Sequence, residues 1–591
     1  MRLTGGLVLR GVVWAAIVAL AAPAWGQANS ENKAFSGRGS GADYNSPQVK
    51  RINEEIRRVW DDHKLRPSAP ATDGEWCRRL YLDVLGRVPS VEELRDFLSK
   101  KEPDRKVRLI HKLLEDDTYT EEYARNWTTI WTNILIGRNG GLERRSLISR
   151  EGMQKYLRDS FAHNKPYDRM VYELVTATGS TSPGETGKAN HDFNGATNFL
   201  VMKLEENAAQ ATAMTSKVFL GLQVQCTQCH NHPFNEWKQQ KFWEFNAFFR
   251  QTKYLREFAQ GGRDVENVKL FNQDFAGEGS GGSGTSEAII YYELRNGLLQ
   301  SAFPVFVDGK EIGKSGHLSD CDRRTELGKL IVQSPFLDKT IANRMWQHFL
   351  GYGFTKPVDD LGPHNNPSHP ALLEYLGDEF RKSGFNLKEM IRWIVLSEPY
   401  SLSSKITNQN KDDDPLKGEA PKFTHFYLRQ MQAEELYQSL LVATRADQLK
   451  MGYEEQERLK SDWMKQFVVA FGTDEGDEAT TFNGTIPQAL MLMNGELVKQ
   501  TIDIKKGSFL DKIATSTMKP GDKIHYLFEA AVARKPTRDE IDKANHLLVA
   551  HGMEDQRQKK GRPETPVDVA TLALQDIFWA VLNSNEFILQ H

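Results

Sequence analysis

The stretch VKRINEEIRRVWDDH, residues 49–63, carries the pattern on which the fold of this chain depends. Ile52, Ile56 and Val59 recur at the spacing of one face of an α-helix, and charged residues occupy positions between them. Apolar series with the same period run on to about Ile136. The sequence therefore predicts amphipathic helices that each bury one apolar face.

Capping signals mark where predicted helices begin. Ser90 opens the segment SVEELRDFL, and Glu93 follows three positions later, which is the spacing of a capping box. A further helical pattern covers residues 208–220, and helical periodicity returns after Arg323 and continues to the last residues. The chain is therefore expected to be mainly α-helical.

One part of the chain departs from the helical pattern. Residues 277–286, GEGSGGSGTS, form a low-complexity segment that cannot bury a core. The stretches AIIYYEL and SAFPVFVDGKEI that follow are rich in β-branched and aromatic residues, and Asp308-Gly309 in the second predicts a hairpin turn. We therefore expect two helical domains, residues 47–257 and 323–591, joined by a small β-containing insertion, residues 258–322.

Two distant stretches resemble each other. RVPSVEE at residues 87–93 is matched by RKPTRDE at residues 534–540, and each predicts a capped helix start behind an apolar helix. An internal duplication would explain the match, and so would the general likeness of helix ends. The sequence leaves both explanations open.

Length and composition exclude several classes of protein. At about 100–200 residues per domain, 591 residues predict two to four units. The balance of 39% hydrophobic and 26% charged residues is that of a globular protein. A net charge of −3 argues against a nucleic-acid binder, which needs a basic excess for phosphate contacts. Four cysteines are too few for a disulfide scaffold.

The first residues have the pattern of an export signal. Arg2 and Arg10 flank the start, the apolar run of residues 11–22 is shorter than the about 20 residues of a membrane helix, and small residues follow it. We expect a signal peptide over residues 1–26 and a flexible leader over residues 27–46. An uncleaved anchor is the competing interpretation. The mature chain is then expected in the periplasm, outside the cell or in the envelope, without a membrane span.

The motif with the clearest chemistry is Cys226-Thr-Gln-Cys229-His230. Cys-x-x-Cys-His is the attachment pattern of c-type haem, in which both thiols add to the haem vinyl groups and the histidine presents its imidazole to the iron. Such attachment takes place outside the cytoplasm. The motif and the predicted signal peptide therefore support each other.

Two other chemistries suit the same residues. Cys226 and Cys229 form a disulfide in many exported Cys-x-x-Cys pairs. Alternatively, the two cysteines with His230 and His232 hold zinc or another thiophilic metal. The sequence does not choose a second iron ligand for the haem interpretation.

A second group of polar residues lies in the C-terminal half, on one helix face and in a loop rich in Gly and Pro. Its members are Arg344, His348, Asp359, Asp360, His364 and His369. Carboxylates and imidazoles together bind cations or act as acid and base, which would suit a hydrolase or lyase acting on extracellular polymers. A network of helix caps and ion pairs that braces the loop explains the same residues.

The chain resembles a large family of exported planctomycete proteins. The resemblance rests on RRLYLDVLGRVPSVEEL (78–94), FLGLQVQCTQCHNHPFNEW (219–237) and NRMWQHFLGYGFTKPVDDLG (343–362), in that order. These relatives pair a cytochrome-like domain of unknown function with a second, C-terminal domain of unknown function. The resemblance implies an exported protein with a cytochrome-like Cys-x-x-Cys-His motif, but it implies neither a substrate nor a reaction.

The leading hypothesis is a protein that binds c-type haem, or else zinc or another metal, and serves electron transfer or a redox step. Its expected partner is a redox protein or a component of the cell envelope. A polymer-acting hydrolase or lyase is the first alternative. An envelope scaffold, in which the cysteines brace a loop, is the second. The sequence leaves open whether the chain is an enzyme.

Overall fold

The structure, a computed structural model, describes most of the chain beyond the first residues. The described residues are 43–143, 145–184, 190–234, 237–258, 265–278, 287–445, 452, 458, 502, 504, 508–558 and 569–591. The predicted signal peptide and nearly all of the predicted leader lie outside them. So does most of the Gly/Ser-rich segment.

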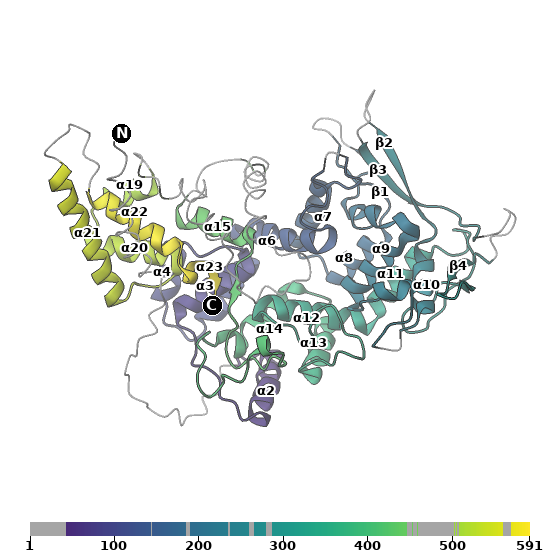
Figure 1. Ribbon diagram of the computed structural model, residues 1–591, viewed down its shortest axis with the longest axis horizontal. Coiled ribbons are helices and arrows are strands. Elements are labelled where there is room, and N and C mark those ends of the chain that lie inside the picture. Colours follow the sequence, from purple (N-terminus) through teal and green to yellow (C-terminus); the bar gives the residue numbers. More distant parts are fainter. Residues whose placement is uncertain are drawn as a thin grey trace.

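The chain is mainly α-helical with small sheets, so the predicted fold class is confirmed (Figure 1). The helices of the first half are α2 (Pro47–Asp62), α3 (Asp73–Leu85), α4 (Val91–Ser99), α5 (Arg105–Glu115), α6 (Asp117–Ile136), α7 (Arg150–Ala162), α8 (Tyr167–Thr176), α9 (Glu205–Thr215) and α10 (Gln239–Asn246). Those of the second half are α11 (Arg323–Gln333), α12 (Pro335–Leu350), α13 (Pro370–Lys382), α14 (Leu387–Val395), α15 (Ala433–Ala443), α19 (Phe509–Ala514), α20 (Pro520–Val532), α21 (Arg538–Gln558), α22 (Val569–Leu582) and α23 (Asn585–Ile588).

Local sequence explains where these helices begin. At the start of α2, the Ser46 hydroxyl accepts a hydrogen bond from the backbone N–H of Val49, and Pro47 occupies a position whose N–H would have no helical partner. The predicted capping box of Ser90 and Glu93 forms at α4, where each side chain accepts from the other residue's backbone N–H. Both caps satisfy donors that the helix itself leaves open.

The strands form small antiparallel sheets, most of them in or around the expected insertion and one that joins residues 429–430 to residues 589–590. They are β1 (Gly179–Ser180), β2 (Thr252–Phe258), β3 (Val265–Asn272), β4 (Ile290–Glu293), β5 (Leu299–Ala302), β6 (Arg429–Gln430) and β7 (Leu589–Gln590). β3 lies between β1 and β2, while β4 pairs with β5. The first strand next to the insertion, β2, begins at Thr252, earlier than the change of pattern at residue 258 indicated. The turn predicted at Asp308-Gly309 is present, because Gly309 donates its N–H to the carbonyl of Phe306 over 2.8 Å.

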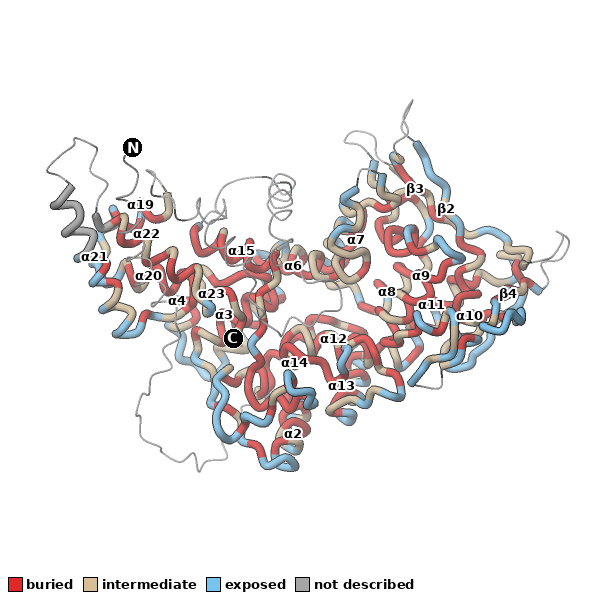
Figure 2. The backbone as a smooth tube through the Cα atoms, viewed as in Figure 1, coloured by how far each residue is buried: buried red, intermediate tan, exposed pale blue. Residues whose placement is uncertain are grey.

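The hydrophobic core is shared between the two halves of the chain. Figure 2 shows buried residues along α8, α11, α12 and α14, and one cluster of buried side chains extends from Val49 of α2 to Leu402 and beyond. A second cluster joins Leu82 and Val91, at α3 and α4, to side chains of α15, α20 and α22. Helices α3 and α6 lie between the lobe of α7–α11 and helices α19–α22, whereas α2 lies beside α13 and α14 (Figure 1).

Buried arginines of α3 hold the last residues of the sequence. Arg78 donates to the carbonyls of Phe587 over 2.7 Å and Leu589 over 3.1 Å, across 509 and 511 positions of sequence. Arg79 is fully buried and donates to the carbonyl of Leu402 over 3.0 Å. Since buried guanidinium groups need acceptors, these contacts tie β7 and the segment around residue 402 to α3.

The two similar stretches fold in the same way. Arg87 follows Gly86, which has a left-handed φ of 70°, and donates to both carboxylate oxygens of Glu93 over 2.8 and 2.9 Å. It also pairs with Glu122 of α6.

Arg534 repeats each of these contacts. It follows Ala533, which has a φ of 54°, and donates to both oxygens of Glu540 over 2.9 Å. Its second partner is Glu586 of α23, at 2.6 Å. Since Glu122 and Glu586 lie outside the matched stretches, likeness of helix ends does not account for them, and an internal duplication is favoured.

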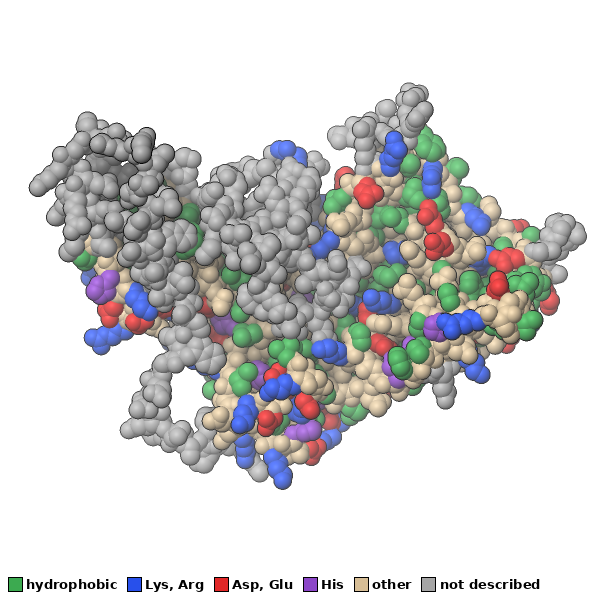
Figure 3. Space-filling view, in the orientation of Figure 1, with side chains coloured by type: hydrophobic (Ala, Val, Ile, Leu, Met, Phe, Trp, Pro, Cys, Tyr) green, Lys and Arg blue, Asp and Glu red, His purple; other side chains and the backbone are tan. Residues whose placement is uncertain are grey.

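None of the helices in the described residues is both long and apolar enough to cross a membrane. On the described part of the face in Figure 3, acidic and basic side chains are interspersed. That distribution agrees with a net charge close to zero.

Candidate functional site

The two candidate cysteines lie in an exposed turn between α9 and α10. After α9, a π-helical turn (Ser216–Leu220) ends at Gly221, whose left-handed φ is 61°, and a 3-10 turn (Gln225–Gln228) follows. We call residues 222–234 the Cys loop. Cys226 and Cys229 are both exposed and both carry free thiols. In this structure the pair forms no disulfide, and its thiols are accessible to a reagent or a cofactor.

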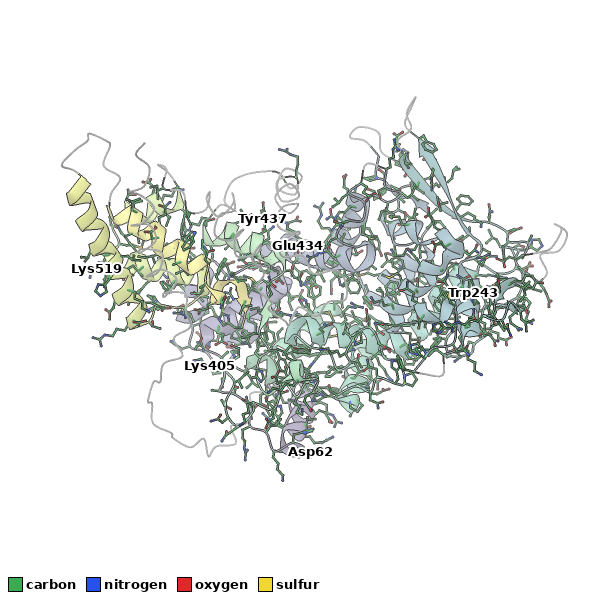
Figure 4. All side chains as sticks on the ribbon, viewed as in Figure 1. Asp62, Trp243, Lys405, Glu434, Tyr437 and Lys519 are labelled. Carbon is green, nitrogen blue, oxygen red and sulfur yellow. The ribbon has the colours of Figure 1, made fainter. Side chains whose placement is uncertain are left out.

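Two side chains of α10 fix the back of the Cys loop. The carbonyl of Gln228 accepts hydrogen bonds from the indole of Trp243 and from the amide of Gln239, each over 3.1 Å. Gln239 also donates to the carbonyl of Glu293 in β4, and Trp243 stacks on Tyr292 with ring centroids 5.9 Å apart. Figure 4 labels Trp243 in this lobe. The small β insertion therefore helps to position the turn that carries both thiols.

The two histidines of the Cys loop hold opposite tautomers. His230 donates from Nδ1 to the carbonyl of Asn231 over 2.6 Å, so its Nε2 keeps a lone pair. His232 accepts at Nδ1 from the backbone N–H of Phe234 over 3.2 Å, so its Nε2 carries the proton. Metal-binding histidines commonly donate one ring N–H to a carbonyl in the way that His230 does, whereas the neutral ring of His232 has no lone pair left for a metal.

A loop from the C-terminal half lies against the Cys loop. We call residues 358–364 the Asp–His loop. Its Leu361 donates a backbone N–H to the carbonyl of Gly221 over 2.6 Å. Its Asp359 accepts from the amide of Gln223 over 2.7 Å and lies 3.3 Å from the ammonium of Lys217. Two groups of residues that the sequence presented separately are therefore neighbours.

An imidazole–carboxylate pair completes this junction. His364 Nε2 lies 3.1 Å from a carboxylate oxygen of Asp360, and the His364 ring lies 5.2 Å from the ring of His232. Burial lowers the pKa of His232, and nearby His364 lowers it further. Burial raises the pKa of the Cys226 thiol, and the negative charge of Asp360 adds to that rise.

These contacts bear on which cofactor suits the site. Within the described residues, no three His, Cys, Asp or Glu side chains are arranged to hold a metal ion. Covalent haem attachment needs fewer protein groups than such a metal site, namely two accessible thiols and one imidazole with a free Nε2 lone pair. Cys226, Cys229 and His230 meet those conditions as they stand.

His348 lies apart from this junction, where its half-buried ring packs against the core between α12 and α3. Its Nε2 donates to the carbonyl of Asp83 over 3.1 Å, and its ring packs 5.0 Å from that of Trp127. Burial lowers the pKa of His348 to about 4, so the ring is neutral at ordinary pH. Here it joins α12 to α3.

Arg344 and His369 are also distant from the Cys loop contacts. His369 lies between the rings of Phe354 and Phe423, at 5.7 and 5.4 Å, and burial lowers its pKa to about 4. The Nε and Nη2 atoms of Arg344 are buried without a hydrogen-bond partner among the described residues. Of the six polar residues in the second predicted group, the structure brings Asp359, Asp360 and His364 to the Cys loop.

The buried histidines predict sensitivity to acid. The unfolded chain protonates His348 and His369 near their ordinary pKa of 6.5, whereas the folded chain protonates each only near pH 4. Between these values the unfolded state binds more protons, so stability falls as the pH falls. We expect a loss of about 2 kcal/mol per histidine between pH 7.5 and pH 5, measured by urea unfolding.

The variant His348→Gln is the control for this prediction. Glutamine keeps a donor for the carbonyl of Asp83 but does not titrate, so the loss between pH 7.5 and pH 5 should shrink by the share of His348. The same pH dependence in the variant and the natural chain would contradict the prediction.

Several residues of the site were not predicted from the sequence. Gln223, Gln239 and Trp243 fix the Cys loop through amide and indole groups, and Lys217 pairs with Asp359. Such residue types have no characteristic spacing. Only the position of Gln223, within three residues of the motif, pointed toward the site.

Two family models match the chain, in the order that the resemblance implied. Residues 51–254 match PSCyt2, a protein of unknown function (DUF1549), and residues 323–478 match PSD1, a protein of unknown function (DUF1553). Neither the curated proteins nor the solved structures include a match. The Cys loop lies in the first matched segment and the Asp–His loop in the second, so the two segments meet at the candidate site.

Proposed function

We propose that this protein is a redox protein that carries one c-type haem on the Cys loop. The observation that carries the proposal is the state of the motif: two accessible free thiols, and a His230 tautomer that keeps the Nε2 lone pair. A bound haem would supply a centre that accepts and releases one electron. The chain contributes attachment and orientation.

Each residue of the motif has a distinct task in this proposal. The Cys226 and Cys229 thiols would hold the haem covalently, each by adding its S–H across one vinyl group, so that no atom would be lost. His230 would bind the haem iron through Nε2, and its hydrogen bond to the carbonyl of Asn231 fixes the orientation of the ring. Gln239 and Trp243 hold the turn between the thiols by their bonds to Gln228.

The setting of this chemistry is part of the proposal. Residues 1–26 would direct export, and haem attachment would follow in the periplasm or another compartment of the envelope. Electrons then need a partner, either another redox protein or an envelope component. The exposed Phe234 ring, 78% accessible beside the motif, offers such a partner apolar contact.

The test is a pyridine haemochrome spectrum, with metal analysis, on protein exported by a host that matures c-type cytochromes. We expect the band of a c-type haem and about one iron per chain, because the described residues contain one Cys-x-x-Cys-His motif. The double variant Cys226→Ser, Cys229→Ser should contain no covalent haem. Cys77→Ser, which changes a buried thiol away from the motif, should load normally.

Other outcomes decide between the alternatives. Protein without haem but with about one zinc or copper per chain would replace the haem proposal with a metal site that forms by rearrangement of Cys226, Cys229, His230 and His232. Protein with neither cofactor would overturn the redox proposal. It would direct attention to hydrolase or lyase chemistry at the Asp360–His364 pair, whose 3.1 Å contact suits a general base oriented by a carboxylate.

A further inference from the structure

We infer that the Asp–His loop is the second half of the cofactor site, and that His364, held by Asp360, is a positioning residue for the Cys loop. This inference rests on the proposed function, because it assigns a role toward the group that the Cys loop would carry. It gives the second matched segment a task at a site whose cysteines all belong to the first.

The Asp–His loop packs closely against the chain at Gly221, the residue just before the Cys loop. Leu361 donates its N–H to the Gly221 carbonyl over 2.6 Å. A side chain at position 221 would place its Cβ 2.7 Å from the Thr340 hydroxyl and 3.0 Å from the Leu361 side chain. The path of the chain into the Cys loop is therefore set by α12 and the Asp–His loop together.

The Asp–His loop is itself held firmly to α12. Asn343, fully buried in that helix, donates to the hydroxyl of Thr355 and to the carbonyl of Val358, both over 2.8 Å. It also accepts from the N–H of Phe354 over 2.6 Å. Just beyond the loop, Asn365 donates to the carbonyl of Asp360 over 2.8 Å. A loop fixed at several points can serve as a platform for a neighbouring, more exposed turn.

His364 is the side chain through which this platform reaches the Cys loop. Asp360 is 8% exposed and accepts from the N–H of Gly362 with one oxygen, while its other oxygen lies 3.1 Å from His364 Nε2. The oriented His364 ring then packs 5.2 Å from His232, which is two residues from His230. Among the residues that the structure describes, the charged and titratable groups that act on His232 are His364, Asp360 and His230.

The structure also contains a matched pair away from the site. His317 Nδ1 lies 3.0 Å from a carboxylate oxygen of Asp274, but both side chains are about half exposed and neither belongs to the Cys loop contacts. Variants of this pair remove an equivalent imidazole–carboxylate contact. They control for the loss of any such contact.

The first measurement uses protein without haem, made in the cytoplasm. His364→Phe keeps a ring beside His232 but loses the bond to Asp360, whereas Asp360→Asn keeps an oxygen for Gly362 and loses the charge. We expect amide hydrogen exchange of residues 222–234 to become at least fivefold faster in both variants. His317→Phe should leave it unchanged, and His364→Gln, which retains a donor for Asp360, should restore most of the protection.

The second measurement uses the haem-loaded protein. The visible spectrum and reduction potential should change in His364→Phe and Asp360→Asn, while His317→Phe should match the natural chain. A purely structural role for His364 would lower the melting temperature and leave these two properties unchanged, which would overturn the inference.

Failure of the two proposals can be told apart. If the natural chain takes up no haem, the proposed function fails, and the exchange data still decide whether His364 positions the Cys loop. If the natural chain takes up haem, but amide exchange, visible spectrum and reduction potential are all unaltered in His364→Phe and Asp360→Asn, the inference about His364 fails. The proposed function then still stands.

Discussion

Asp83→Ala is expected to destabilise the protein by about 4 kcal/mol. Asp83 is fully buried in α3, where one carboxylate oxygen pairs with Arg429 and the other accepts from the Tyr400 hydroxyl over 2.7 Å. Burial already lowers the pKa of Arg429 to about 10. Without Asp83, that guanidinium would remain buried without its hydrogen-bonded carboxylate, and only the more remote charge of Glu435 would still offset it, so the loss of this ion pair is costly. Urea unfolding at neutral pH measures the loss.

Asp96→Ala provides the comparison for this result. Asp96 pairs with Lys100 over 2.8 Å, but both side chains are nearly half exposed, so we expect a loss of at most about 0.5 kcal/mol. The double variant Asp83→Ala, Arg429→Met should recover part of the loss, because it removes the stranded charge. A loss in Asp83→Ala no larger than that in Asp96→Ala would refute the account of this network.

Gly221→Val is expected to lower haem content at least tenfold and to destabilise the chain. Valine at a φ of 61° is strained by about 1–3 kcal/mol, and its Cβ would collide with Thr340 and Leu361. The collision separates the Cys loop from the Asp–His loop and breaks the bond from Leu361 to residue 221. Haem per chain and the melting temperature are the quantities to measure.

Gly384→Val separates backbone strain from crowding. Gly384 has a φ of 70°, close to that of Gly221, but nothing lies within 4 Å of the position where its Cβ would be. The variant Gly384→Val should have a lower melting temperature because of this backbone strain, and its haem content should equal that of the natural chain. Equal haem loss in both variants would show that strain alone is responsible and that the contact between the loops is not.

Local patterns predicted the helices well because their causes are local. The Ser90–Glu93 capping box and the apolar face of Ile52 and Ile56 depend on residues within a few turns, and the structure has both. The start of β2 at Thr252 was missed, because strand formation there depends on cross-strand neighbours in β3, which the local sequence does not show. Sequence patterns identify such short exposed strands poorly.

The site was predictable only in part, for a similar reason. Cys226, Cys229 and His230 form a contiguous motif that the sequence shows directly. The approach of His364 to His232 joins residues 132 positions apart, through packing of α12 against the turn before the Cys loop. His348 is a histidine like His364 and has a helical spacing with Arg344, but its ring packs against the core and bonds to the carbonyl of Asp83. Periodicity places a residue on a helix face but does not say what covers that face.

The contacts of Arg78 with Phe587 and Leu589 have a consequence for how the chain is made. On the ribosome, helix α3 emerges more than five hundred residues before its acceptors, since the partners are 509 and 511 positions away. Arg78, which is buried in the folded protein, therefore has neither of these acceptors until the segment with Phe587 and Leu589 has been synthesised. Such long-range closure makes folding slow and late, and the nascent chain should depend on chaperones throughout its synthesis.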